Sequence, residues 1–306
     1  MACKSIVFVG NEEDDEDLGQ IFKCLERNGH RGSRVHPRDF VFLCEDGRIQ
    51  VSVAGQAFNA DLVVGWIFED WLAPGGAILE ALALAGYEVV NCASVLSRGQ
   101  NKALMSARLH ARQVPHGTVF WSYDPNDTRD RFTELSRPFV VKPGLVNSGG
   151  RTVRSSGYGV CRISSAEGLE ALHETLANLG QPLYMQSYVE RPECRDIRIW
   201  LLGFEPIAAC YKIPRGGNWI TNTHYGIDLK VCELTAPLVE LGKRAAQAIE
   251  AEIAGVDIAE TMNGDLVVLE VNTCPTFGPA GQLFGDRIPQ AYADFFAKRS
   301  GTDRCA

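Results

Sequence analysis

Short apolar runs alternate with helix-like spacing in the first third of the chain. The predicted elements are a strand from Ser5 to Val9, a buried strand from Ala60 to Trp66, a helix from Ile78 to Ala85 and a strand from Tyr87 to Val90. Strands that alternate with helices in this way favour a parallel sheet covered by helices. We therefore expect residues 1–94 to form an N-terminal, mostly parallel α/β domain.

The middle of the chain has weaker patterns. The spacing from Asn101 to Arg112 predicts a helix, and Phe139 to Val141 is a brief buried strand that leads into Lys142. A stretch rich in Gly, Ser and Arg follows, from Asn147 to Gly159, and then a strand (Val160 to Ile163) and a helix (Ala166 to Leu179). We expect residues 95–184 to form a central domain with this glycine-rich stretch as a loop.

Long strands dominate the last third. The pattern predicts strands at Leu183 to Glu190, Asp196 to Leu202 and Pro206 to Lys212, a helix from Ala236 to Ile253 and a final hairpin from Val256 to Asn272. We expect residues 185–306 to form a C-terminal domain on an antiparallel sheet. The whole chain is then of mixed α/β (α+β) class.

The final hairpin carries three polar side chains. Asn263-Gly264 predicts a two-residue type I′ turn, which sets Asp257 directly opposite Glu270. Asn272 lies two residues further and therefore on the same face. The opposite face is predicted to be a core face, formed by Val256, Ile258, Val267, Leu269 and Val271.

Two carboxylates that face each other across a sheet repel, so we expect a cation between them. Two carboxylates and an amide suit Mg²⁺, which takes its remaining oxygens from water and substrate phosphates. On this basis, removing either charge should relieve repulsion in the metal-free protein. A polar, solvated sheet face without metal is the alternative.

Two further features suit phosphate groups. Lys142 follows the apolar run RPFVV, so a scaffold positions its compact charge. The glycines of SSGYGV, residues 155–160, allow backbone N–H groups to approach phosphate oxygens. Neither the Walker A nor the dinucleotide-binding pattern fits this segment. Each feature alone is equally typical of an edge lysine or an ordinary loop.

Composition narrows the class of protein. Among 306 residues, 45% are hydrophobic and 22% charged, which is ordinary for a soluble globular chain. The formal net charge of −8 gives no general attraction for nucleic acid or an anionic membrane. The 10 cysteines form no C-x-x-C pair and the N-terminus does not have a signal-peptide pattern, so we expect reduced thiols and a cytoplasmic protein.

Taken together and in order, the motifs resemble those of the ATP-grasp superfamily, and most of all its RimK-like amino-acid ligases. The resemblance extends from about Tyr87 to Pro275 and rests on NCASVLSRGQNKALM, RPFVVKP, SSGYGV, MQSYVE, CRDIRIWLLG, TNTHYG and GVDIAE followed by LVVLEVNTCP. It implies three domains, with ATP held between the central lid domain and the C-terminal domain.

The resemblance also implies roles for individual residues. ATP would be bound by Lys102, Lys142, Ser156, Gly157, Gly159, Gln186, Tyr188, Val189 and either Glu193 or Asp196. Magnesium, for which manganese can substitute, would be bound by Asp257, Glu270 and Asn272. The catalytic groups would be Lys212, Arg215 and Asn222, facing the transferred phosphoryl group. Ser187 and Ile220 depart from the family pattern near the lid and acceptor, and therefore bear on substrate identity.

The expected reaction is ATP-dependent joining of a carboxylate to an amine through an acyl phosphate, with an amino acid or small peptide as substrate. A ligase that modifies a protein or peptide, or cyclises a small metabolite, is an alternative within enzymes. A nucleotide-binding regulator without turnover is the alternative of another class. The sequence leaves open the identity of both substrates and is compatible with a homo-oligomer.

Overall fold

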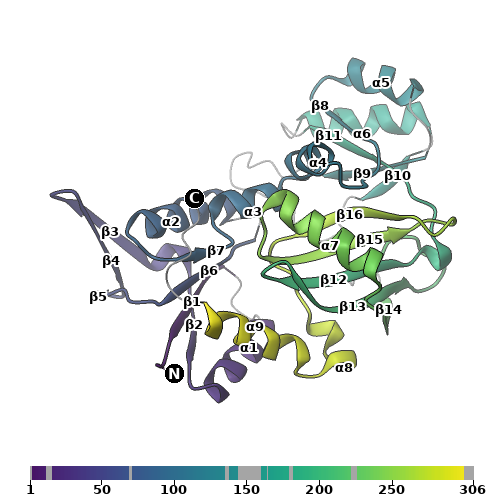
Figure 1. Ribbon diagram of the computed structural model, residues 1–306. Coiled ribbons are helices and arrows are strands. Elements are labelled where there is room, and N and C mark those ends of the chain that lie inside the picture. Colours follow the sequence, from purple (N-terminus) through teal and green to yellow (C-terminus); the bar gives the residue numbers. More distant parts are fainter. Residues whose placement is uncertain are drawn as a thin grey trace.

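The computed structural model describes residues 2–11, 16–68, 71–134, 138–143, 160–163, 165–178, 182–221 and 226–299. Their strands form four sheets, of which one is parallel and three are antiparallel. Figure 1 shows the parallel sheet on one side of the molecule and two of the antiparallel sheets stacked on the other. The mixed α/β class expected from the sequence is confirmed.

The parallel sheet has the strand order β2-β1-β6-β7, formed by Arg31–Val35, Ser5–Gly10, Leu62–Trp66 and Val89–Val90. Its central strands are fully buried apolar runs, which is typical of a sheet covered on both faces. Helices α1 (Glu16–Arg27) and α2 (Leu72–Leu84) join consecutive strands. The N-terminal α/β arrangement follows from these runs.

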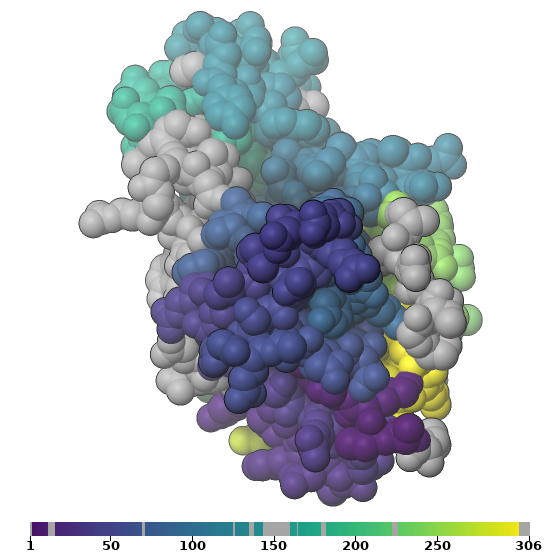
Figure 2. All heavy atoms as spheres, turned by 90° about the vertical axis from the view of Figure 1, so that its left-hand side faces the viewer, coloured from purple at the N-terminus to yellow at the C-terminus, as the bar shows by residue number. Residues whose placement is uncertain are grey.

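A small antiparallel sheet projects from this part of the molecule. It consists of β3 (Phe40–Glu45), β4 (Arg48–Val53) and β5 (Gln56–Ala57), after a short 3₁₀ turn at Pro37–Asp39. Figure 2 looks at this side and shows the first third of the chain covering most of it. None of the elements predicted from the sequence lies here. In β3, apolar side chains lie on both faces, since Phe40 is buried whereas Val41 and Leu43 are exposed.

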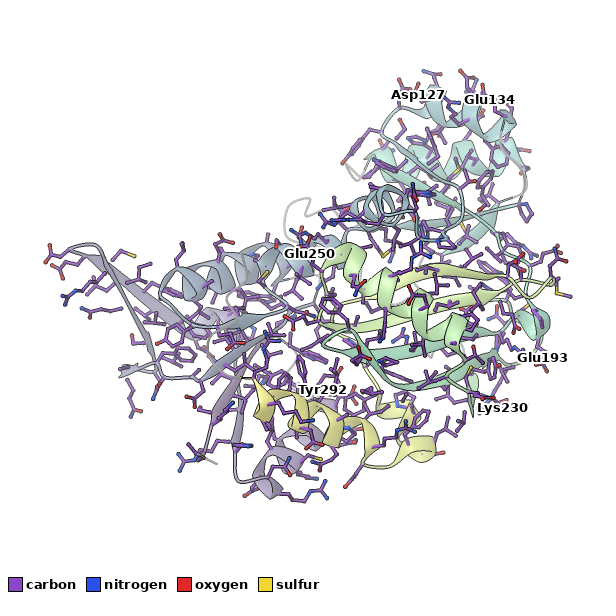
Figure 3. All side chains as sticks on the ribbon, viewed as in Figure 1. Asp127, Glu134, Glu193, Lys230, Glu250 and Tyr292 are labelled. Carbon is purple, nitrogen blue, oxygen red and sulfur yellow. The ribbon has the colours of Figure 1, made fainter. Side chains whose placement is uncertain are left out.

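The C-terminal helix returns to the N-terminal sheet. Helix α9 (Arg287–Lys298) lies beside α1, and its Tyr292 and Phe296 are fully buried against Phe8 and Trp66. Figure 3 shows Tyr292 at the junction between the N-terminal sheet and the large antiparallel sheet. A short 3₁₀ turn (Gly278–Ala280) and α8 (Gly281–Phe284) precede this helix.

The central sheet has the order β10-β9-β11-β8, formed by Cys161–Ile163, Phe139–Pro143, Leu183–Ser187 and Val119–Ser122. Helices α5 (Pro125–Glu134) and α6 (Ala166–Asn178) cover it around a core that includes Phe132 and Phe139. The expected domain boundary between residues 184 and 185 falls inside β11. The domain limits themselves stay a prediction.

The large antiparallel sheet has the order β14-β13-β12-β15-β16, formed by Ile227–Val231, Glu205–Pro214, Asp196–Leu202, Ile253–Glu260 and Leu266–Asn272. Helix α7 (Ala236–Ile249) covers one face. Helices α3 (Ala93–Gln100) and α4 (Lys102–Ala111) are joined to the end of α7 by Glu250, which pairs with Arg98 and Arg108. The opposite face of the sheet lines a pocket.

The turn between β15 and β16 differs from the expected one. The Thr261 N–H donates to the Asp265 carbonyl (2.8 Å), so the loop between them has three residues, Met262 to Gly264. Only Gly264 has a positive φ, of 87°, whereas a type I′ turn would also require one at Asn263. The predicted two-residue turn is therefore wrong.

The pairing of Asp257 with Glu270 is nevertheless confirmed, because a second irregularity restores it. The register shifts by one residue between Asp257 and Ile258, which leaves Leu269 as an extra residue in β16. Leu269 lines the pocket instead of the core, and Val268 takes the core position predicted for Val267. The predicted core face is thus wrong at Val267 and Leu269. It is confirmed at Val256, Ile258 and Val271, which are fully buried.

Within the described part of the chain, no helix is long and apolar enough to cross a membrane. The nine cysteines that the structure describes are all free thiols.

Candidate active site

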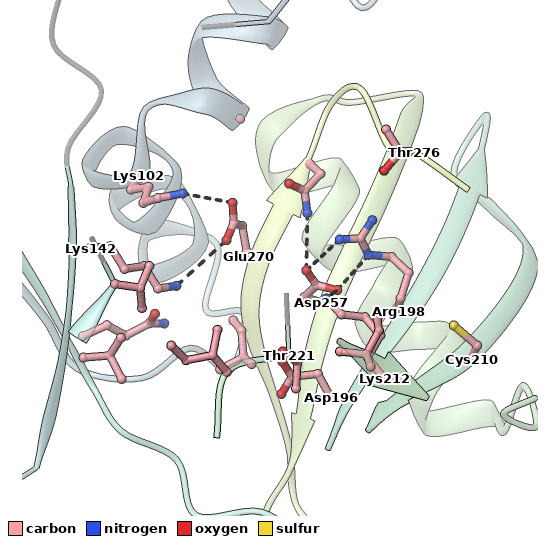
Figure 4. A pocket seen from close by; sticks show the side chains of 18 of the residues that line it. Lys102, Lys142, Asp196, Arg198, Cys210, Lys212, Thr221, Asp257, Glu270 and Thr276 are labelled. Atoms are coloured by element: carbon pink, nitrogen blue, oxygen red, sulfur yellow. Dashed lines mark hydrogen bonds and ion pairs between the residues drawn. The ribbon is translucent and has the colours of Figure 1, made fainter. Parts of the chain in front are cut away.

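A pocket of about 440 Å³ lies between the central sheet and the large antiparallel sheet (Figure 4). Strands of both sheets line it, together with the start of α4 and the segment that follows β16. It brings together ten residues predicted from the sequence: Lys102, Lys142, Gln186, Tyr188, Val189, Asp196, Lys212, Asp257, Glu270 and Asn272.

Four polar side chains form one row across the large sheet. Glu270, Asp257, Arg198 and Cys210 are register neighbours on β16, β15, β12 and β13. Asp257 accepts two hydrogen bonds from Arg198, at 2.7 and 2.8 Å, and one from Lys212 at 3.2 Å. Burial raises the pKa of Asp257, but Arg198 and Lys212 outweigh it and hold this pKa well below the ordinary aspartate range.

Glu270 faces the other way, toward two lysines. Lys102 donates to its carboxylate at 3.0 Å, and the Lys142 ammonium lies 4.0 Å from it (Figure 4). Burial alone would raise the pKa of Glu270, but the two lysines lower it. Burial, together with the charge of Lys102, lowers the pKa of Lys142, although Glu270 opposes this. The two lysines thus come from α4 and the central sheet to meet a carboxylate of the large sheet.

The expectation that Asp257 and Glu270 need a bound cation between them is corrected by these ion pairs. Each carboxylate is already neutralised by basic side chains of the protein itself. Removing the charge of Asp257 would therefore leave Arg198 buried without its partner, so the expected relief of repulsion has no basis.

Three side chains at this end of the pocket could supply oxygen ligands to a magnesium ion. Asp257 and Asn272 lie together, since the Asn272 amide nitrogen is 3.5 Å from the Asp257 carboxylate, and Glu270 is two residues from Asn272 on the same strand. Among the described residues, no group of three or more His, Cys, Asp or Glu could hold a metal by itself. One or two carboxylates completed by substrate phosphates are the usual magnesium set, and that is what these residues offer.

Strand β11 of the central sheet and the residues that follow it supply the rest of the predicted nucleotide site. Gln186 on β11 is almost fully buried, and its side-chain nitrogen has no hydrogen-bond partner. Tyr188 and Val189 follow it along the pocket wall. Asp196 also lines the pocket, but it pairs with Arg191 at 3.0 Å and accepts from Thr221. Glu193, the alternative to Asp196 among the predicted ATP-binding residues, lies outside the pocket: it is exposed and pairs with Arg195.

The three predicted catalytic residues have different outcomes. Lys212 lines the pocket beside Asp257. Arg215 is not among the lining residues; its side chain is 63% exposed and pairs with Asp228 at 2.6 Å. The position of Arg215 does not fit contact with a phosphoryl group in this structure. Asn222, like Ser156, Gly157 and Gly159 of the glycine-rich loop, lies outside the described residues.

Several residues that build the pocket are not among those predicted from the sequence. Arg191 and Thr221 bind Asp196, and the sequence gives no pattern for either. Trp200 could have been found, since it lies two residues beyond Arg198 and therefore on the same face of β12. Gly255 is needed because a β-carbon there would lie 2.6 Å from Pro275 and 3.1 Å from the Arg198 guanidinium.

A partly buried chain of polar contacts reaches the backbone of β16 at Val268, two residues before Glu270. The His116 ring contacts the Val268 carbonyl at 2.7 Å and Ser106 at 3.0 Å, and Ser106 contacts the Tyr184 hydroxyl at 2.8 Å. Burial lowers the pKa of His116 to about 4 and raises the pKa of Tyr184. Both groups are therefore neutral near pH 7, and the chain of contacts connects α4, β11 and β16 without adding charge.

Comparison with known proteins identifies a family and similar chains. The profile of the RimK-like ATP-grasp domain matches residues 99–284. The tetrahydromethanopterin:alpha-L-glutamate ligase of Methanococcus maripaludis is 32% identical over 211 residues, covering 67% of this chain and 68% of that protein. The alpha-aminoadipate–LysW ligase LysX of Saccharolobus solfataricus is 25% identical over 261 residues, covering 81% and 85%.

The fold is also that of a solved ligase. The structure of the ATP-grasp ligase PsnB, complexed with a phosphomimetic variant of a minimal precursor, Mg and ADP, has a TM-score of 0.70 to this chain. The alignment covers 99% of this chain and 100% of that chain at 18% identity, so it establishes the fold alone.

Proposed function

The chain belongs to the RimK-like ATP-grasp family and is an ATP-dependent C–N ligase, and from this premise we propose that Mg·ATP binds in the pocket between the two antiparallel sheets. The observation that carries the proposal is the meeting of Lys102 and Lys142 with Glu270, next to Asp257 and Asn272. Cations for phosphates and oxygen ligands for magnesium thus lie in one place.

We assign the lysines to the triphosphate and the three oxygen-bearing residues to magnesium. Lys102 and Lys142 would leave Glu270 for the phosphate oxygens, which frees the Glu270 carboxylate for the ion. Magnesium, when bound, neutralises charge on the phosphates as the terminal phosphoryl group moves. Gln186, Tyr188 and Val189 form the wall that would receive the adenine.

The reaction would proceed through an acyl phosphate. A substrate carboxylate oxygen attacks the terminal phosphorus of ATP, and ADP leaves with the electron pair of the broken P–O bond. The amine then attacks the acyl carbon, loses a proton, and displaces inorganic phosphate. Arg198 and Lys212 lie where they can hold the carboxylate and the developing charge, so the protein mainly positions and screens the reactants.

We propose an amino acid or a small peptide as one substrate, because both named relatives are amino-acid ligases. The alternative of a nucleotide-binding regulator without turnover is disfavoured, because a regulator needs no complete set of phosphate-binding and magnesium-binding residues. One pocket here contains Lys142, Asp257, Glu270 and Asn272. A cytoplasmic setting, manganese as a substitute ion and a homo-oligomeric state are further proposals; the free thiols support the first.

ADP release with pooled amino acids, Mg²⁺ and ATP tests the proposal. We expect release that depends on the amino acids and that Lys142→Ala reduces strongly. Lys230→Ala is the matched control, since Lys230 is exposed and outside the pocket (Figure 3). Release independent of any added substrate, or equal in both variants, would contradict the proposal.

A further inference from the structure

The pocket-facing side of the large sheet changes character from one cross-strand row to the next. One row contains the charged groups Glu270, Asp257 and Arg198. The next row along the strands contains Asn272, Gly255, Trp200 and Ala208, which carry no charge. In Figure 4, Thr276 lies on the far side of Arg198 from the lysine–glutamate group, and Cys210 lies beside Arg198 on the neighbouring strand. A substrate that extends past Arg198 therefore leaves the charged part of the pocket.

The region beyond Arg198 is mostly apolar, and its uncompensated polar atoms, the Thr273 hydroxyl and the Gln100 side-chain oxygen, carry no charge. The Trp200 indole N–H donates to the Thr276 carbonyl at 3.2 Å, so the small part of this buried ring that reaches the pocket is carbon. Phe277 and Ala280 belong to the same core cluster as Trp200, and the half-buried Phe68 packs against it. Leu229, which is also half-buried and packs against this cluster, lies on β14 opposite Lys212. Burial raises the pKa of the Cys210 thiol to about 12, which keeps it uncharged.

The charge of the lining residues gives an independent argument. In the described part of the pocket there are five cations, Lys102, Lys142, Arg191, Arg198 and Lys212, and each is paired with Asp196, Asp257 or Glu270. Five cations against three carboxylates leave a small positive surplus, which the phosphates and the reacting carboxylate would use. No lining cation among these residues is left to balance a second carboxylate at the Trp200 end.

We propose that the substrate extending past Arg198 carries an uncharged, apolar side chain, aliphatic or aromatic, which packs on Trp200, Phe68 and Leu229. This inference rests on the proposed ligase function and names its substrate class. An acidic side chain at the same place would lose its hydration without gaining a partner, whereas an apolar one gains from leaving water. The chain therefore selects against glutamate at this position.

ADP release measured with individual amino acids tests the selection. Leucine, phenylalanine, methionine and glutamate are each supplied once as the carboxylate substrate and once as the amine substrate. Methionine is the uncharged control for glutamate, because its side chain has a similar length. We expect kcat/KM for the apolar amino acids to exceed that for glutamate by roughly tenfold or more. Glutamate turned over as well as or better than methionine would overturn the inference and leave the ligase function standing.

Two pairs of variants locate the selection in the pocket. Leu229→Arg adds a free cation to the apolar wall and should raise the preference for glutamate over methionine roughly tenfold, while Leu229→Met should not change this preference.

Phe68→Ala should raise KM for phenylalanine. Phe295→Ala removes another half-buried ring, which lies outside the pocket, and should leave KM unchanged. Equal behaviour within either pair would count against the assignment.

Thermal unfolding with Mg²⁺ and a non-hydrolysable ATP analogue separates the two claims. If leucine or phenylalanine raises Tm in this complex and glutamate does not, the side-chain class stands even when no pair releases ADP, and only the ligase function fails. If no apolar amino acid changes either Tm or ADP release, the inference is overturned.

Discussion

At the residue level, Asp257 connects stability with function. Its carboxylate is the only partner shown for the Arg198 guanidinium among the described ion pairs, and both side chains are mostly buried. Removing one member of such a pair leaves the other charge buried and uncompensated. We expect Asp257→Asn to lower the free energy of unfolding by about 3 kcal/mol or more.

The matched control is Asp228→Asn, which removes the partner of the exposed Arg215 and should leave stability unchanged.

The contribution of Asp257 to the free energy of unfolding depends on pH with a defined sign. The pKa of Asp257 is lower in the folded protein, so its contribution is present above the unfolded-state pKa and is lost as the pH falls toward the folded-state pKa. Thermal unfolding at about pH 7 and about pH 3 should show the gap between wild type and Asp257→Asn narrowing in acid.

Lys142 is the second residue with a testable role. We expect Lys142→Ala to weaken binding of a non-hydrolysable ATP analogue, because it removes a charge held at the end of β9 next to Glu270. Lys142→Arg should restore binding only in part, since a guanidinium is larger and forked. Calorimetric titration measures both, and an unchanged Kd in Lys142→Ala would mean that Lys142 is a structural edge lysine.

At the level of elements, the final hairpin offers a test of its turn. Gly264 has a positive φ and Asn263 does not, so Gly264→Ala should destabilise the protein by about 1 kcal/mol and Asn263→Ala by much less. Chemical denaturation of both variants measures the difference. A type I′ turn would instead make both substitutions costly.

The same hairpin shows how far a sequence predicts a site. The pairing of Asp257 with Glu270 could be predicted, but only because a three-residue loop and a bulge at Leu269 offset each other. Local sequence does not specify the bulge, whose extra residue faces the pocket rather than the core. Strand β12 was predicted with its observed bounds because its polar and apolar residues alternate. Strand β3 was missed because apolar residues occupy both of its faces, and β4 was missed although its residues alternate.

Contacts distant in sequence were beyond prediction for a related reason. The partners of Asp257 and Glu270 come from β12, β13, α4 and β9, and no pattern along the chain says which cation meets which carboxylate. Only the fold brings Lys102 within 3.0 Å of Glu270. The residue types of the site were therefore predictable, but their pairing in the absence of ligand was not.

For the molecule as a whole, Asn91 joins the N-terminal parallel sheet to the large antiparallel sheet. Its side-chain nitrogen donates to the carbonyls of Ile253 and Thr273, at 2.7 and 2.8 Å, and its side-chain oxygen accepts from the Ile253 N–H. Thr273 follows Asn272 directly, so this contact also supports the proposed magnesium site. Asn91→Ala should lower the free energy of unfolding by about 2 kcal/mol or more, because it leaves buried backbone groups unpaired.

Asn91→Gly separates two contributions to that loss. Asn91 has a φ of 49°, which glycine adopts without strain. We expect the glycine variant to lose the same hydrogen bonds and to be less destabilised than the alanine variant. Denaturation of both would show whether the contacts or the backbone conformation dominates, and wild-type stability in both would contradict a joining role for Asn91.

The fate of the carboxylate oxygen reports the chemistry proposed for the pocket. With the substrate carboxylate labelled with oxygen-18, attack on the terminal phosphorus followed by displacement by the amine transfers one label to the inorganic phosphate. Mass spectrometry of the released phosphate should therefore find the label there, with ADP as the other product. Label in AMP instead, or unlabelled phosphate alongside amide product, would contradict an acyl phosphate formed between Lys142 and the Asp257–Asn272 oxygens.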